Sequence, residues 1–114
     1  MKKQWYVATL IVQCRVGDQQ DGPFTCEEQI RLIRAVDEEE AYQKALQLGK
    51  GEEVVYQNSD GEDVFWEFVG LEDLEELFDK TISDGREIRS RLSEQDRPSE
   101  LVCSKAALSV FVDD

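Results

Sequence analysis

The chain has no histidine among its 114 residues, and this absence removes several kinds of active site. Without an imidazole there is no Ser-His-Asp triad, no Cys-His pair and no imidazole base. The sequence also lacks the glycine-rich motifs that bind phosphates and dinucleotides. We therefore predict no catalytic residue and no cofactor, and the sequence favours a protein that is not an enzyme.

Cysteine is scarce and unpatterned, because Cys14, Cys26 and Cys103 make an odd number without CxxC spacing. Zinc sites contain closely spaced ligands, so no metal site is predicted. Unpaired cysteines without an export signal are typical of reduced thiols, and the expected location is the cytoplasm. The apolar run at residues 5–12 is too short for a signal peptide, and no run has the length of a transmembrane helix.

Basic residues are almost missing from residues 37–79, which hold 15 of the 26 Asp and Glu but only Lys44 and Lys50. This stretch therefore accounts for the whole net charge of −13. Nucleic acids and anionic membranes are bound through clustered Lys and Arg, so neither is an expected partner. A basic protein is an expected partner, because opposite fields steer association. The alternative is an acidic surface that serves only solubility.

The apolar pattern predicts one α+β domain over residues 1–114. Residues 4–16 alternate with a period of two and carry apolar side chains on both faces, which is typical of a central strand. A second strand is expected at 25–36, after a turn at 17–23. If that turn centres near Gln20, Cys14 faces Cys26 in an antiparallel pair and the even-numbered residues share one face.

The remaining elements have clear boundaries in the sequence. Asp37 is a helix N-cap and Gly49 a stop, and the apolar stripe between them contains Ala41, Ala45 and Leu46. Residues 53–57 and 62–69 predict a hairpin, and 86–94 a last strand. Leucines at 71, 74 and 77 recur at helical spacing, and the apolar tail at 108–111 is expected to dock on the core. The expected architecture is an antiparallel sheet of about five strands with one main helix packed on one face and a short second helix.

Two surfaces are candidates for binding. The first is an acidic partner surface on the expected second helix, where the acids alternate with leucines and face water: Glu72, Asp73, Glu75 and Glu76. The second is a ligand face on the sheet, because guanidinium groups make paired hydrogen bonds with carboxylates and phosphates: Arg31, Trp66, Glu67, Arg89 and Arg91. For these arginines the sequence favours a ladder of cross-strand ion pairs over a ligand site, with Glu67 and Glu87 as partners.

Four segments resemble an uncharacterised bacterial family, the domain-of-unknown-function family 4288, and the chain is similar to its cyanobacterial members. They are WYVA at 5–8, EQIRLI at 28–33, EEEAYQKAL at 38–46 and VFWEFVG at 64–70. The resemblance runs from about Trp5 to Leu77 and implies a shared fold. It implies no reaction and no catalytic residue.

These observations predict a non-enzymatic protein-interaction or regulatory module of the bacterial cytoplasm with an unknown, basic protein partner. One specific version is an antagonist or immunity-type protein that masks a basic toxin or nuclease. A small-ligand domain, sensory or enzymatic, with its site around Trp66, Glu67, Arg89 and Arg91 is the alternative. Neither the partner's identity nor the oligomeric state follows from the sequence, and a homo-oligomer is compatible with it.

Overall fold

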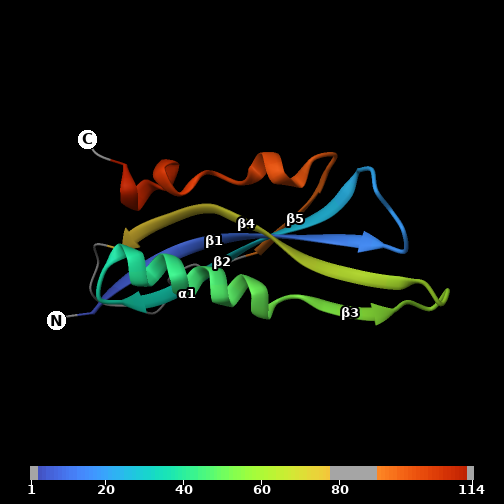
Figure 1. Cartoon of the computed structure of the whole chain (residues 1–114), viewed down its shortest axis with the longest axis horizontal. Helices are drawn as coiled ribbons and strands as arrows, with labels where there is room; N and C mark the ends of the chain where they lie inside the picture. The colour runs from blue at the N-terminus through green and yellow to red at the C-terminus, as the bar shows by residue number, and fades with distance from the viewer. Residues whose placement is uncertain (1–2, 78–89, 113–114) are drawn as a thin grey trace.

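The computed structural model describes residues 3–77 and 90–112, which form a five-stranded antiparallel sheet with a helix on one face (Figure 1). The strands are β1 (Gln4–Val16), β2 (Phe24–Ala35), β3 (Val54–Gln57), β4 (Asp63–Leu77) and β5 (Ser90–Gln95). Their order across the sheet is β3-β4-β1-β2-β5. Helix α1 (Glu38–Gly51) joins β2 to β3, and three 3-10 turns follow β5: η1 (Pro98–Leu101), η2 (Lys105–Ala107) and η3 (Ser109–Phe111). The predicted α+β class is confirmed.

β1 is the central strand, as its pattern predicts, with a buried face toward the helix and a half-buried face on the other side. Tyr6, Ala8 and Leu10 point to the helix side and lie in the main core cluster. Ile11 alternates with them and is also fully buried. Hydrophobic side chains on both faces of one strand fit a position in the middle of a covered sheet.

The register of β1 and β2 differs by one residue from the prediction. Gln13, not Cys14, lies opposite Cys26, and Leu10 lies opposite Gln29. Even-numbered residues of β1 therefore share a face with odd-numbered residues of β2. The prediction was wrong because a one-residue change in where the turn is centred reverses which side chains share a face. Cys14 and Cys26 consequently lie on opposite faces, and both thiols are free.

The predicted second helix is also wrong, because residues 71–77 continue strand β4. Two register shifts interrupt the pairing of β1 with β4, and they leave Val69 and Glu72 without a directly opposite residue. The extra residue at Glu72 brings Leu71 and Leu74 to the same face, although they are three residues apart. A bulged strand thus produces the spacing that predicts a helix.

Helix α1 packs on the sheet through its smallest residues. Asp37 caps the helix by accepting a hydrogen bond from the Glu40 backbone N–H at 2.8 Å. Ala41, Ala45 and Gly49 are the buried residues of the helix, and they allow the backbone to lie close to the strands. Larger residues of the predicted stripe, such as Leu46, pack at the margins of the core. The predicted packing of the stripe on the sheet is confirmed.

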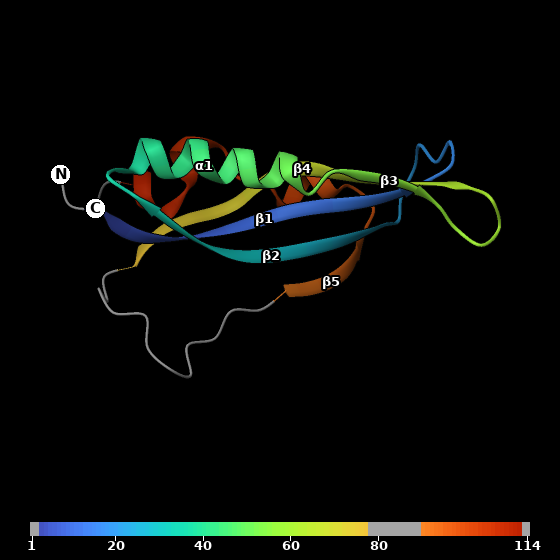
Figure 2. The same cartoon turned by 90° about the horizontal axis from the view of Figure 1, so that it is seen from below.

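The C-terminal segment, residues 98–112, lies along β4 and ends on the helix side of the sheet (Figure 2). The Cys103 N–H donates to the Leu71 carbonyl at 3.0 Å, which satisfies part of the outer edge of β4. Asp73 then accepts from both the N–H and the hydroxyl of Ser109, at 2.8 and 2.9 Å. Leu108 is buried in the main core, so the predicted docking of this tail is confirmed.

Candidate functional site

Acidic side chains from two distant parts of the sequence gather around the hydroxyl end of Tyr6. The cluster, called here the acidic end, consists of Asp37, Glu38 and Glu76. Burial raises the pKa of Tyr6, and the charges of Glu38, Glu76 and Asp37 raise it further. The helix start and the end of β4 lie at the same end of the elongated molecule (Figure 1). This arrangement concentrates negative charge at one end of the long axis.

Two acids of the first helical turn, Glu39 and Glu40, have cations beside them. Lys44 lies 3.5 Å from Glu40, and Lys105 donates to Glu39 and lowers its pKa. Within residues 3–77 and 90–112, neither Glu38 nor Glu76 has a cationic partner. In the part of the chain that the structure describes, the carboxylates of Glu38 and Glu76 are therefore not neutralised by a direct ion pair.

The four predicted partner-surface residues lie on a strand and do not share one face. Glu76 lies opposite Tyr6 on the helix side, whereas Glu75 lies opposite Val7 on the other side and is exposed. Asp73 accepts hydrogen bonds that hold Ser109, so it has a structural role. Glu72 lies at a register shift. In the folded chain, Glu76 lies near the acids of the helix start, although 38 residues separate it from Glu38 in the sequence.

The residues of the predicted ligand face are also divided. Trp66 and Glu67 are neighbours in β4 and therefore point to opposite faces. Arg31 forms an ion pair with Glu52 and not with Glu67. Arg91 lies in β5 opposite Glu28, and Arg89 lies outside the described residues, as does Glu87. The described members thus do not form one site.

Glu67 instead belongs to an ion-pair cluster with Arg15 on the face away from the helix. Arg15 donates to Glu67 through Nε at 3.2 Å and Nη2 at 3.3 Å, and its guanidinium lies 4.2 Å from the centre of the Phe65 ring. Gln13 donates to the same carboxylate. These contacts, chiefly those from Arg15, hold the pKa of Glu67 below its ordinary value. Glu67 thus forms a cross-strand ion pair with Arg15, whereas the prediction that Arg31 would pair with Glu67 was wrong.

A shallow hollow lies on the helix side of the sheet, beyond the end of α1. Its volume is about 190 Å³, and its lining combines one indole with carboxylates, an amide and two valines: Val12, Glu27, Gln29, Glu52, Val54 and Trp66. Arg31 borders it through hydrogen bonds to Gln29 and Glu52. The Arg31 guanidinium is therefore already hydrogen-bonded to side chains of its own chain.

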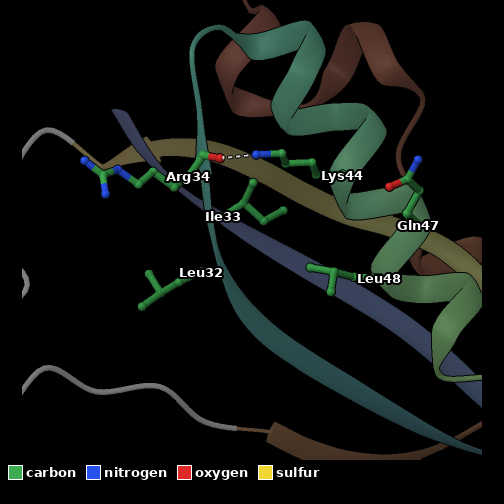
Figure 3. A pocket seen from close by; sticks show the side chains of 6 residues that line it. All are labelled: Leu32, Ile33, Arg34, Lys44, Gln47 and Leu48. Atoms are coloured by element: carbon green, nitrogen blue, oxygen red, sulfur yellow. Dashed lines mark hydrogen bonds between the residues drawn. The ribbon is translucent and has the colours of Figure 1, made fainter. Parts of the chain in front are cut away.

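A larger groove of about 390 Å³ separates α1 from β2 (Figure 3). Leu32, Ile33, Arg34, Lys44, Gln47 and Leu48 line it. Lys44 crosses one end and donates to the Arg34 carbonyl at 2.7 Å. No residue of this groove was predicted from the sequence, because the groove forms only where α1 and β2 come together.

No helix among the described residues is long and apolar enough to cross a membrane. In the same part of the chain, no group of three His, Cys, Asp or Glu is placed to hold a metal ion. The family model of the Domain of unknown function (DUF4288) matches residues 5–90. No curated protein and no solved structure matches the chain.

Proposed function

The chain belongs to the DUF4288 family, and we propose that it is a non-enzymatic protein-interaction module that binds a basic protein in the bacterial cytoplasm. The acidic end is the proposed contact surface. The observation that carries the proposal is the convergence of Asp37, Glu38 and Glu76, from two elements, at one end of the molecule. The three cysteines of the chain are free thiols, and this supports a location in a reducing compartment.

The electrostatic argument concerns the rate of encounter and the selection of a partner. A cluster of charges of one sign attracts a surface of the opposite sign and raises the association rate, and salt weakens the effect. The opposite end of the molecule, about 50 Å away along the long axis, lies several Debye lengths distant. Only charges near the contact surface should therefore change capture of the partner.

The test is affinity capture from a lysate of the source organism with charge-neutralised variants. The test variant replaces Glu38, Glu75 and Glu76 by glutamine, which keeps the shape of each side chain. Asp37 and Asp73 stay unchanged, because the first caps α1 and the second holds Ser109. Capture of basic proteins should fall, and the loss should be largest at low salt.

A matched control removes the same number of charges from the other end of the sheet. Asp18, Asp21 and Asp60 are exposed residues of the turns after β1 and before β4, and each is replaced by asparagine. Both variants carry a net charge of −10 in place of −13, so a general effect of net charge would lower capture equally. Equal capture by the two variants, with both folded by circular dichroism, would contradict the proposal.

A further inference from the structure

Among the residues that the structure describes, the exposed large hydrophobic side chains lie mainly on the two outer strands of the sheet. Val54, Val55 and Tyr56 of β3 are 50%, 62% and 50% exposed, and Leu92 of β5 is 63% exposed. Among the described residues, no strand pairs with the outer side of β3. An exposed apolar edge strand is a template for another strand.

The backbone of β3 offers hydrogen bonds at this edge. The Asn58 N–H donates to the Glu62 carbonyl at 2.9 Å, and the register 54–57 against 66–63 continues from that pair without a shift. Hydrogen-bonded residues alternate along an antiparallel pair, so Tyr56 and Val54 bond to β4. Val55 and Gln57 therefore direct their N–H and C=O groups away from β4, to the outer edge.

The two acids that directly precede this edge, Glu52 and Glu53, already have hydrogen-bond partners within the chain. Glu52 pairs with Arg31, and a Glu53 carboxylate oxygen accepts from the Phe68 N–H at 3.2 Å. The stretch from residue 54 to 59 contains no charged residue at all. A basic partner strand would find no free carboxylate along the strand itself, whereas an uncharged strand would find a matching surface.

We propose that β3 pairs antiparallel with β3 of a second copy of this chain, with the two-fold axis at Val55. In this register, the outward-facing N–H and C=O groups of Val55 in one copy bond to the C=O and N–H groups of Val55 in the second copy. It places Val54 opposite Tyr56 of the second copy, an aromatic–β-branched pair of the kind that stabilises sheets. Glu53 then faces Gln57 of the second copy, so the register opposes no like charges.

The electrostatic repulsion between two chains that each carry a net charge of −13 weakens the dimer. It does not determine which residues of the two strands lie opposite each other. The acidic end and the β3 edge lie at opposite ends of α1 (Figure 1). Charges farther apart than about 8–10 Å are largely screened at physiological ionic strength. The pairing edge is only four residues long, so the dimer is a weak one, below the usual interface size. Added salt should strengthen it.

The experiment is sedimentation equilibrium of the whole chain from about 10 μM to about 1 mM, at low and at moderate sodium chloride. We expect a monomer–dimer equilibrium that shifts toward dimer with salt. Val55→Lys places two like charges face to face on the axis and should raise the dissociation constant about tenfold or more. Leu92→Lys is the matched control, because it makes the same charge change at an exposed apolar residue of the other outer strand.

A mixing experiment tests the axis itself. Val55→Lys and Val55→Glu should each be monomeric alone and should form a heterodimer when mixed, since opposite charges then face each other. The inference is overturned if the parent stays monomeric at every concentration, or if Val55→Lys dimerises as well as the parent. It is also overturned if Leu92→Lys abolishes assembly, or if oligomers larger than a dimer form.

Discussion

Replacing Gly49 by alanine should destabilise the protein, although intrinsic helix propensity predicts the opposite. In a helix interior, alanine is about 0.8–1.0 kcal/mol more favourable than glycine. A Cβ atom at residue 49, however, would lie 2.3 Å from Cε1 of Phe68. That separation is far shorter than van der Waals contact, so either the Phe68 ring or the helix must move.

Both responses cost more than the gain in propensity. Overpacking of a core costs about 1–3 kcal/mol. A ring that swings into water loses part of the roughly 1.5–3 kcal/mol that burial of a large apolar side chain supplies. After subtraction of the propensity gain, the free energy of unfolding should fall by up to about 2 kcal/mol. For a domain of about this size, each kcal/mol lowers the melting temperature by roughly 4–8 °C.

Urea unfolding followed by circular dichroism measures this change, and Gly51→Ala supplies the control. Gly51 is the last residue of α1, and nothing lies within 4 Å of a Cβ built on it. Gly51→Ala should therefore be neutral or add up to about 1 kcal/mol. In a Phe68→Leu background, Gly49→Ala should lose most of its cost, because the two sites are coupled. If Gly49→Ala is as stable as the parent in the native background, the close packing of α1 on Phe68 is refuted.

Three further measurements follow from the burial and charge of the structure. Burial raises the pKa of the Cys14 and Cys26 thiols, so Ellman's reagent should label the exposed Cys103 first in the folded protein. All three thiols should react after unfolding. Equal labelling rates of the three thiols in the folded state would contradict this prediction. Glu67→Gln should lower stability at pH 7 by less than about 1 kcal/mol, since the carboxylate is about a third exposed. Because the folded pKa of Glu67 is lowered, its contribution is present above the unfolded pKa of about 4.3 and is lost as the pH falls through the folded pKa. The difference in urea unfolding between the parent and the variant should therefore shrink as the pH is lowered below about 4.3. Moderate sodium chloride should raise the melting temperature by screening the excess of acids, and a melting temperature that falls steadily with salt would show that favourable ion pairs dominate.

The local elements of this fold follow from short stretches of the sequence. Alternation with a period of two identified β1 and its central position, and Asp37 was correctly predicted as the cap of α1, whereas the stop predicted at Gly49 was wrong because the helix continues to Gly51. Residues 58–61 predicted the turn between β3 and β4, where the Asn58 side chain accepts from two backbone N–H groups. These features depend on backbone preferences and hydrogen bonds within a few residues, so they can be deduced from short windows of sequence.

How these elements pair depends on contacts that form only in the folded chain. The register of β2, the two shifts in β4 and the partner of Glu67 all depend on contacts between residues far apart in the chain. A bulge changes which face a leucine occupies without changing local composition, so Leu71 and Leu74 give the pattern of a helix while they lie in a strand. The acidic end has the same origin, because Glu38 and Glu76 meet only when α1 and the end of β4 pack on the same strand, β1.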